Sequence, residues 1–354
     1  MLFRMTETAA NKGRAGGSDG SGEMLPGRCF EAVSFSFRAN VVIYVSMSLE
    51  VFILGTGGMM PLPNRFLTSV LVRREGDLFL FDCGEGTQVS LRKMNLRWKK
   101  ISVIFISHTH ADHVTGLPGI LMLSSQVDRD EPLYVVGPPK IRDYVYANRR
   151  ILEMYINYRI EVIEEAGAAE VFRGDGYRVR SYPLDHSKPC VAYILEEDMR
   201  PGVFHPEKAQ ALGVPRGPLW SKLQSGEPVR AEDGRLVQPD EVLGEERKGR
   251  KFGFVTDTVP VPGLADFVRG ADLLICEGMF TADLLESAED KKHLTARQAA
   301  QIAVEAEVKS LGLIHYSPRY TRRELQHLLD EAQEVFPETF LTKEGQTIGL
   351  PNPD

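Results

Sequence analysis

The sequence has few cysteines and no long hydrophobic run. Its four cysteines, Cys29, Cys83, Cys190 and Cys276, are scattered and form no Cys-x-x-Cys pair, so they indicate neither a disulfide framework nor a cysteine zinc site. This pattern is typical of a protein in a reducing, cytoplasmic compartment. No apolar run approaches the roughly 20 residues that a membrane helix needs. The first residues also lack the apolar stretch of a signal peptide, and we therefore expect no membrane partner.

A basic excess is also missing. The net charge is −7 at pH 7, whereas many nucleic-acid-binding domains are strongly basic. Local patches matter more than the sum, so an RNA partner is not excluded. Each basic stretch is either a phosphate-binding patch or a solvated face. The three stretches are Arg92, Lys93, Arg97, Lys99 and Lys100; Arg247, Lys248, Arg250 and Lys251; and Arg319, Arg322 and Arg323.

The composition is that of a globular protein with a substantial core, because 43% of the 354 residues are hydrophobic and 26% are charged. We interpret residues 1–46 as a disordered N-terminal extension or as the result of a mis-assigned start, since residues 1–30 are rich in Gly, Ser and charge without an apolar period. Residues 47–354 form the predicted folded domain. Within it, residues 198–250 are rich in Gly, Pro and charge, which predicts an inserted arm or a long loop.

From Leu49 onward, short apolar segments alternate with helical stretches, which indicates the α/β class. A helix is predicted at Glu85–Met94. Thr295–Gln298 and Thr321–Glu324 each match a capping box, the signature of a helix start. The predicted strands are Leu49–Leu54, Leu67–Arg73, Leu78–Asp82, Val103–Ile106, Leu133–Val136, Tyr177–Tyr182, Val191–Leu195, Phe252–Thr256, Leu273–Ile275 and Leu311–Ile314.

One segment concentrates potential metal ligands directly after a predicted strand. His108, His110, Asp112 and His113 lie within six residues. Imidazole suits zinc, and a carboxylate can complete the ligand set. Alternate residues of an extended segment project to the same side, so His108 and His110 can bind one metal while Asp112 and His113 address a second.

Two metals need more ligands than this segment supplies. His186, Asp257 and His315 each follow a predicted strand, and strand ends in an α/β sheet converge on one edge. Taken singly, such a histidine is more often a core or surface residue, but the cluster favours the metal. Manganese or cobalt could replace zinc. In the predicted assignment, His108, His110 and His186 bind the first zinc, and Asp112, His113 and His315 bind the second. Asp257 bridges both.

Asp112, His293 and Glu277 are the candidate catalytic residues. His293 is a candidate general acid for a leaving alkoxide, and Glu277 could raise its pKa and orient it. The alternative is that His293 only decorates a helix start. Asp82 either orients a zinc-bound histidine or begins a helix. The remaining His205 and His327 are interpreted as loop and helix-surface residues.

Two zinc ions roughly 3.5–4 Å apart lower the pKa of bound water to about 7 and neutralise charge on a phosphoryl oxygen. Such a site favours hydrolysis of a phosphodiester, although esters, thioesters and lactams are open to the same chemistry.

These residues resemble the metallo-β-lactamase superfamily and, within it, the ribonuclease Z family of tRNA 3′-processing endonucleases. The resemblance runs from about Leu49 to the C-terminus. Glu277 and His293 match the acid pair of that family. The supporting stretches are Leu54–Gly58, Phe81–Gln88, Ser107–Gly119, Leu212–Pro218, Val255–Thr258 and His315–Tyr320.

The resemblance implies a four-layer αββα sandwich, two zinc ions, a homodimer and a tRNA precursor as substrate. It also implies a product with a 3′-hydroxyl on the tRNA and a 5′-phosphate on the trailer. Leu212–Pro218 resembles the Gly-Pro motif of the family's tRNA-gripping arm, although residues 198–250 mix acids with their bases. Cys276–Met279 and His293–Thr295 depart from the family's usual His-Glu-Ala-Thr and His-Ser-Thr.

The leading hypothesis is therefore a metal-dependent endoribonuclease. The first alternative is a hydrolase of small phosphodiesters or cyclic nucleotides that uses the same metals. A second alternative, of another class, is a metal-binding or RNA-binding protein without turnover, and the full ligand set argues against it.

Overall fold

A computed structural model describes residues 49–126 and 129–353 of the chain. The predicted N-terminal extension, residues 1–46, lies outside the described residues. None of the described helices combines the length and the apolar character that are needed to cross a bilayer.

The first sheet has seven strands, in the order β16-β1-β2-β3-β4-β5-β6. A two-residue turn at Glu75 and Gly76, both with positive φ, joins β2 to β3 as a tight hairpin. Strands β3 to β6 run parallel to one another. The bounds are β1 (Leu49–Gly55), β2 (Ser69–Arg74), β3 (Asp77–Phe81), β4 (Ile101–Phe105), β5 (Leu133–Gly137), β6 (Ile160–Glu164) and β16 (Thr347–Leu350).

The second sheet also has seven strands, in the order β15-β14-β13-β12-β9-β8-β7. Strands β12 to β15 are parallel, whereas β7, β8 and β9 pair antiparallel. All ten strands predicted from the sequence are present in the two sheets, within a few residues of their expected ends. The bounds are β7 (Ala169–Gly174), β8 (Tyr177–Leu184), β9 (Cys190–Glu197), β12 (Lys251–Val255), β13 (Leu273–Glu277), β14 (Leu311–Ile314) and β15 (Thr339–Leu341).

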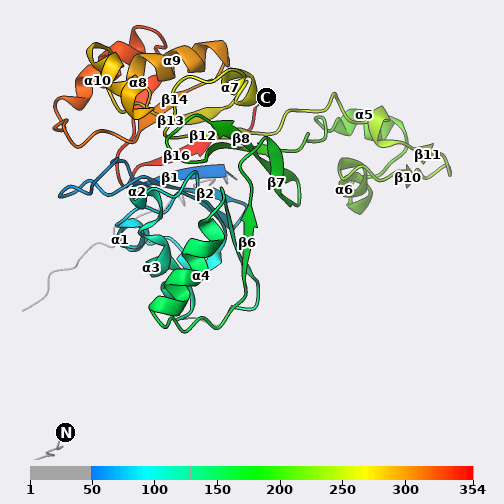
Figure 1. The fold of residues 1–354 in the computed structure, drawn as a ribbon. Coiled ribbons are helices and arrows are strands. Elements are labelled where there is room, and N and C mark those ends of the chain that lie inside the picture. Colours follow the sequence, from blue (N-terminus) through cyan, green and yellow to red (C-terminus); the bar gives the residue numbers. More distant parts are fainter. Residues whose placement is uncertain (1–48, 127–128, 354) are drawn as a thin grey trace, which may run out of the picture. The chain divides into compact units, whose positions relative to one another are not determined.

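Helices cover the outer face of each sheet, as Figure 1 shows. The first sheet is covered by α1 (Thr87–Lys93), α2 (Ala111–Val114), α3 (Leu117–Ser124) and α4 (Ile141–Ile151), and the second by α7 (Leu264–Phe267), α9 (Ala296–Glu305) and α10 (Leu325–Gln333). A further helix, α8 (Leu285–Lys291), lies next to α9 in the sequence. Short 3-10 turns lie at Trp98–Lys100, Pro239–Glu241 and Ala282–Leu284.

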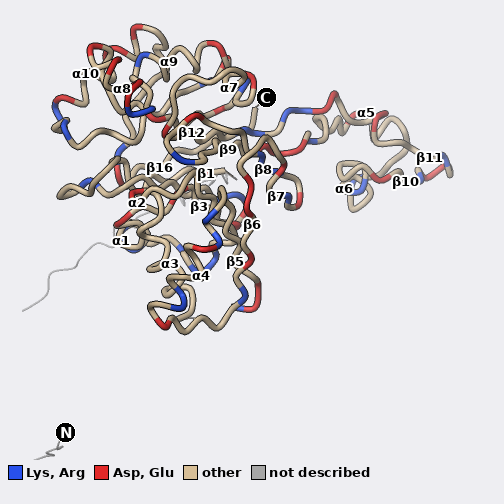
Figure 2. The backbone as a smooth tube through the Cα atoms, viewed as in Figure 1, with Lys and Arg blue, Asp and Glu red and all other residues tan. Residues whose placement is uncertain are grey.

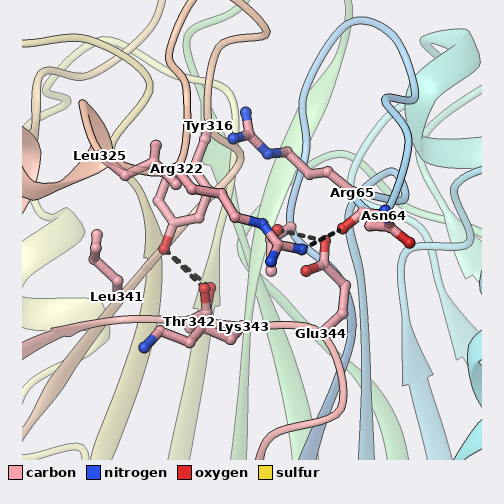
Figure 3. A pocket seen from close by; sticks show the side chains of 10 residues that line it. Asn64, Arg65, Tyr316, Arg322, Leu325, Leu341, Thr342, Lys343 and Glu344 are labelled. Carbon is pink, nitrogen blue, oxygen red and sulfur yellow. Dashed lines mark hydrogen bonds between the residues drawn. The ribbon is translucent and has the colours of Figure 1, made fainter.

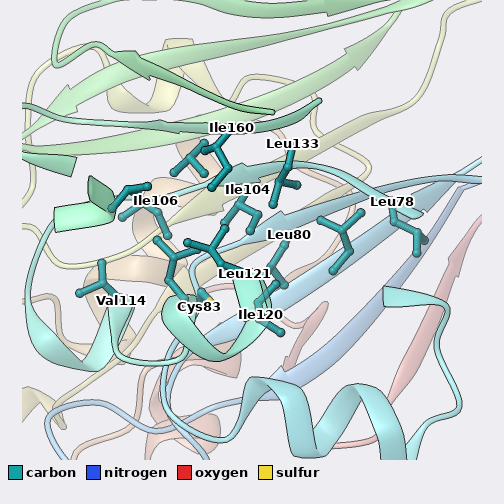
Figure 4. Close-up of a cluster of buried hydrophobic side chains, with 14 of the residues drawn as sticks. Leu78, Leu80, Cys83, Ile104, Ile106, Val114, Ile120, Leu121, Leu133 and Ile160 are labelled. Atoms are coloured by element: carbon teal, nitrogen blue, oxygen red, sulfur yellow. The ribbon is translucent and has the colours of Figure 1, made fainter. Parts of the chain in front are cut away.

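Three apolar clusters hold these layers together. One lies between the first sheet and its helices and includes Leu80, Ile104 and Ile120 (Figure 4). A second joins the other sheet to α7, α9 and α10. The third lies between the two sheets, where Phe81 and Phe254 meet with ring centroids 5.6 Å apart. Each large apolar side chain buried there contributes about 1.5–3 kcal/mol. The predicted four-layer αββα sandwich is therefore confirmed.

Both predicted capping boxes form. The Thr295 hydroxyl accepts from the backbone of Gln298, whose side chain accepts from the backbone of Thr295, and α9 begins at the next residue, Ala296. Thr321 and Glu324 make the same reciprocal bonds, but the α-helix α10 begins only at Leu325. The second box thus shapes the turn before its helix.

Residues 198–250 connect β9 to β12, two antiparallel neighbours of the second sheet. They hold two short helices, α5 (Pro206–Ala211) and α6 (Pro218–Gln224), and a small sheet of β10 (Val229–Arg230) and β11 (Leu236–Val237). Seven buried apolar residues of this segment form a cluster of their own. Figure 2 shows Lys and Arg interspersed with Asp and Glu along it. We call residues 198–250 the arm.

A buried ion pair joins the two ends of the arm, where β9 ends and β12 begins; we call this place the neck of the arm. Glu197, at the end of β9, accepts from Nε and Nη2 of Arg250 at 2.6 Å each and from Nε of Arg74 at 2.9 Å. The Arg250 side chain is 2% exposed. Its Nη1 donates to the backbone oxygen of Leu350, so strands of both sheets meet here. Arg250 is therefore not part of a phosphate-binding patch, as one interpretation of the sequence had it, and Lys251 pairs with Glu196 at 3.2 Å.

Loss of this pair should destabilise the fold. We expect Glu197→Ala to lower the free energy of unfolding by about 3–5 kcal/mol, because two guanidinium groups lose their buried counter-charge. Urea denaturation measures the change. Glu170→Ala is the matched control, since Glu170 pairs with Arg173 on an exposed surface and its loss should leave the midpoint unchanged. Equal midpoints for both variants would contradict the stabilising role of Glu197.

Candidate metal centre

The predicted site residues follow the carboxyl ends of strands from both sheets. The segment from His108 to His113 follows β4, and His186 follows β8. Asp257 and His315 follow the parallel strands β12 and β14, and Glu277 is the last residue of β13 between them. Parallel strands bring their carboxyl ends to one edge of a sheet, which is where these side chains meet.

The first group contains His108, His110, His186 and Asp257, whose potential ligand atoms all lie within 4.8 Å of one another. His110 Nδ1 lies 2.9 Å from His108 Nε2 and 3.1 Å from His186 Nε2. Asp257 Oδ2 lies 3.5 Å from His108 Nε2 and 3.7 Å from His186 Nε2. Three imidazoles and one carboxylate oxygen thus face a common point.

The second group contains Asp112, His113 and His315, again within 4.8 Å of one another. The Nε2 atoms of His113 and His315 are 3.1 Å apart, and His315 Nε2 lies 3.3 Å from Asp112 Oδ2. Asp257 Oδ1 lies 3.4 Å from each of these two imidazole nitrogens. One oxygen of Asp257 therefore faces each group. The structure brings together all seven side chains that the sequence singled out, in the predicted grouping; that they bind metal stays a prediction.

The buried donor set fits divalent cations. Asp257 Oδ1 and His315 Nδ1 are buried without a hydrogen-bond partner among the described residues, a costly state for a polar atom. Two imidazole nitrogens on one tetrahedral zinc, each about 2.0–2.1 Å from it, are roughly 3.4 Å apart. The nitrogens of the first group lie close to that separation already. A cation in the second group would satisfy Asp257 Oδ1 without a rearrangement of the chain, whereas His315 Nδ1 faces Glu277 Oε2 at 3.8 Å.

Electrostatics favours positive charge at this place. Burial lowers the pKa of His108 well below its usual value and that of His110 to about 4, so both imidazoles are neutral, the form that binds metal. Burial also lowers the pKa of His315, but Asp257 with Asp112 and Glu277 outweighs it, and the pKa rises to about 10. Buried carboxylates thus draw protons to the second group, and a divalent cation can supply the same charge.

Outer contacts orient the imidazole rings. Nδ1 of His113 lies 2.6 Å from Asp82 Oδ2, Nδ1 of His108 lies 3.0 Å from Ser107 Oγ, and Nδ1 of His186 lies 2.9 Å from the backbone oxygen of Lys292. Each contact leaves Nε2 toward the centre of its group. This is the usual arrangement around ligating histidines, where the second ring nitrogen fixes the tautomer.

Glu277 and His293 form a pair beside the two groups. Oε2 of Glu277 lies 3.0 Å from Nδ1 of His293, while Oε1 accepts from the backbone N–H of Thr258 at 2.7 Å. Burial lowers the pKa of His293, but the Glu277 carboxylate outweighs this effect, so the net pKa of His293 is raised. His293 Nδ1 is 3.9 Å from Asp257 Oδ2. The pair therefore borders the metal groups and leaves Nε2 of His293 for another partner.

Comparison with known proteins gives the family. The chain is 62% identical over 304 residues to Ribonuclease Z of Treponema denticola, covering 86% of this chain and 99% of that protein. It is 45% identical over 310 residues to Ribonuclease Z of Borrelia hermsii, covering 85% of this chain and 97% of that protein. The chain belongs to the ribonuclease Z family.

Two family models and two solved structures also match the chain. The family described as Beta-lactamase superfamily domain matches residues 228–316, and that described as Anti-Pycsar protein Apyc1 matches residues 49–149. Human tRNase Z, short form, superimposes with a TM-score of 0.63 at 25% identity, covering 85% of this chain and 99% of that chain. A long form RNase Z from yeast superimposes with a TM-score of 0.56 at 18% identity, covering 86% of this chain and 41% of that chain. The predicted resemblance to ribonuclease Z is confirmed, and the protein is a metal-dependent hydrolase.

Asp82 contacts a candidate ligand, as the first of its two predicted roles requires; that it orients a metal-bound histidine stays a prediction. Its carboxylate accepts from the backbone N–H and the hydroxyl of Ser107 at 2.7 and 2.8 Å and contacts His113. It does not begin a helix, because α1 starts at Thr87 after Gly86. The sequence did not reveal the contribution of Gly58. A Cβ there would lie 2.6 Å from the His315 ring, so only glycine lets the loop after β1 pass this imidazole.

Removal of Asp82 should weaken metal binding. We expect Asp82→Ala to lower the affinity for zinc by about 10–100-fold, because the His113 ring loses its orienting carboxylate. Titration against a competing chelator measures the affinity. Asp77→Ala is the matched control, since Asp77 is exposed at the other end of β3. A folded Asp82→Ala variant with unchanged affinity would show that Asp82 does not orient His113 for metal.

The other two histidines lie away from the centre, as predicted. His327 is exposed on α10. His205 precedes α5 in the arm, where its Nδ1 lies 3.2 Å from Glu207 Oε1. Six of the eight histidines therefore lie in the candidate metal centre.

Proposed function

We propose that this protein is a two-zinc endoribonuclease that cleaves tRNA precursors on the 3′ side and leaves a 3′-hydroxyl on the tRNA. The observation that carries the proposal is the 62% identity to a Ribonuclease Z over 304 residues, which covers 99% of that relative. The same chain supplies a complete buried donor set for two cations. Zinc is the proposed metal because imidazole supplies three of the four proposed ligands in the first group and two of the four in the second.

His108, His110 and His186 would hold the first zinc, and Asp112, His113 and His315 the second. Asp257 would serve both, since its two oxygens face different groups. When bound, such a pair of ions lowers the pKa of water and neutralises charge on phosphoryl oxygens. The chain's own contribution is a buried, oriented donor set: Asp82, Ser107 and the Lys292 carbonyl fix three of the imidazoles.

His293 is the proposed general acid. Water attacks phosphorus, the bond from phosphorus to the 3′-oxygen breaks, and the leaving oxygen takes a proton. His293 offers that proton at Nε2, because its Nδ1 is occupied by Glu277. Glu277 orients the ring and stabilises its charged form. The phosphate then stays on the trailer, and the tRNA keeps its 3′-hydroxyl.

The proposal also includes a homodimer and a cytoplasmic location. Members of the family usually form homodimers, and light scattering of the purified protein tests this expectation. Cys83, Cys190 and Cys276 are buried free thiols, which suits a reducing compartment.

Cleavage assays test the substrate. The zinc-loaded protein should cut a tRNA precursor with a 3′ trailer and release a trailer with a 5′-phosphate. A chromogenic phosphodiester run in parallel measures the hydrolytic site without an RNA grip. Hydrolysis of the small ester alone would overturn the proposal in favour of a small-phosphodiester hydrolase.

A further inference from the structure

Two cationic side chains lie over a buried aromatic ring next to the proposed general acid. Phe280 is fully buried and follows β13, three residues after Glu277. The guanidinium carbon of Arg319 lies 5.0 Å from the ring centroid, and Lys291 Nζ lies 5.7 Å from it. The Phe280 and His293 ring centroids are 6.0 Å apart. Arg319 is therefore held over Phe280 on the side of the centre where His293 lies.

Arg319 is exposed, and within the part of the chain that the structure describes it has no counter-ion. Among residues 49–126 and 129–353, no carboxylate oxygen lies within 4.0 Å of its guanidinium, in contrast to Lys292, which pairs with Asp185 at 2.6 Å. An unpaired guanidinium stacked on an aromatic ring keeps its donors for a ligand, and its fork suits a phosphate.

Neighbouring contacts fix the loop that carries Arg319. The buried Arg65 donates to the backbone oxygens of Ser317 and Tyr320 at 3.5 and 3.0 Å. Arg65 also lines a pocket of about 400 Å³ together with Tyr316 and Arg322 (Figure 3). Tyr320 Oη accepts from the backbone N–H of Thr281, the residue after Phe280. The guanidinium and its aromatic platform are thus tied to each other before any substrate binds, which reduces the entropy cost of binding.

The position of the leaving group determines which phosphate of the substrate Arg319 can bind. His293 protonates the 3′-oxygen of the last tRNA nucleotide, so that nucleotide lies on the His293 side of the centre. Its own 5′-phosphate is the next charge along the chain. A small phosphodiester has no such second phosphate. Arg319 therefore lies where only a polynucleotide offers it a partner.

We propose that Arg319, stacked on Phe280, binds the phosphate immediately 5′ of the scissile phosphate in the RNA substrate. The inference rests on the proposed function. It assigns Arg319 to substrate binding and makes this contact one source of the preference for RNA over small diesters.

Charge removal on the protein and on the RNA tests this contact. Arg319→Ala should lower kcat/KM on a tRNA precursor by about 10–100-fold, the range for a charge-assisted hydrogen bond, mainly through KM. Hydrolysis of the chromogenic diester should stay unchanged. The slope of log kcat/KM against log salt should fall by about 0.7, the contribution of one single-stranded phosphate. Arg319→Lys should recover part of the loss, because the charge returns without the planar fork.

Neutral methylphosphonate linkages in the precursor locate the contact. With the neutral linkage one position 5′ of the cleavage site, wild type and Arg319→Ala should cleave equally. With the neutral linkage one position 3′, the difference should persist. Arg269→Ala is the matched control, since it removes the same charge from an arginine between α7 and β13 that pairs with Asp266 and Glu307.

Two results would overturn the inference. One is an Arg319→Ala enzyme that cleaves the precursor like wild type, and the other is a defect that the 5′ methylphosphonate leaves undiminished. Failure of the wild-type enzyme to cleave any tRNA precursor would instead overturn the proposed function, so the two failures are distinguishable.

Discussion

Asp257→Ala is expected to abolish hydrolysis, with a loss of at least about a thousandfold in kcat/KM on both RNA and small diesters. Asp257 is 2% exposed, and its two oxygens face the two groups of imidazoles. Its removal takes one donor from each group and the negative charge that holds the pKa of His113 and His315 high. Metal analysis of the purified variant should show less than the full complement of zinc.

Two further variants sharpen this result. Asp257→Asn keeps the volume of the side chain but not its charge, so it should lose metal as well. Asp266→Ala, which removes an exposed carboxylate on α7, should keep both metal and activity. An Asp257→Ala enzyme that retains two zinc ions and its turnover would contradict the shared position of this residue.

His293→Ala is expected to slow cleavage by about 10²–10⁴-fold while the zinc content stays normal. The general acid donates its proton in the transition state, whereas the seven proposed ligands remain in place. The loss should therefore appear in the rate constant for cleavage that is measured under single-turnover conditions. A leaving group of low pKa, such as nitrophenolate, needs little protonation, so hydrolysis of that ester should be affected much less.

The control for His293 lies on a helix surface. His327→Ala removes an exposed imidazole on α10 and should leave kcat unchanged. If His293→Ala cleaved RNA at the wild-type rate, His293 would only decorate the start of α9, the alternative that the sequence left open.

The sequence was informative about the site because the ligands are polar residues placed directly after apolar strands. His186, Asp257 and His315 are separated by 71 and 58 residues in the chain, and each followed a strand that could be predicted. The outer contacts were harder to foresee. The carbonyl of Lys292 that orients His186, and Gly58 that admits the His315 ring, have no distinctive side-chain pattern.

Elements with mixed burial were missed. β6 and β7 lie at the edges of their sheets, and their strands alternate buried with half-exposed residues. Helix α4 was also not predicted, because only two of its residues are buried, Ile141 and Val145. Arg250 was grouped with its basic neighbours, because the sequence around it does not indicate that it pairs with Glu197, 53 residues earlier. Tertiary contacts decided these cases.

The neck of the arm has a consequence for variation among relatives. Glu196 and Lys251 are direct partners in the antiparallel pair β9–β12, and Arg200 and Arg247 bridge just beyond them. The whole excursion is therefore topologically a hairpin loop whose two ends are already joined. Because closure entropy grows only slowly with loop length, such a loop can lengthen, shorten or be exchanged without changing the register of the sheet. The segment between Arg200 and Arg247 can therefore vary among relatives, while the strand ends that carry the candidate site keep their positions.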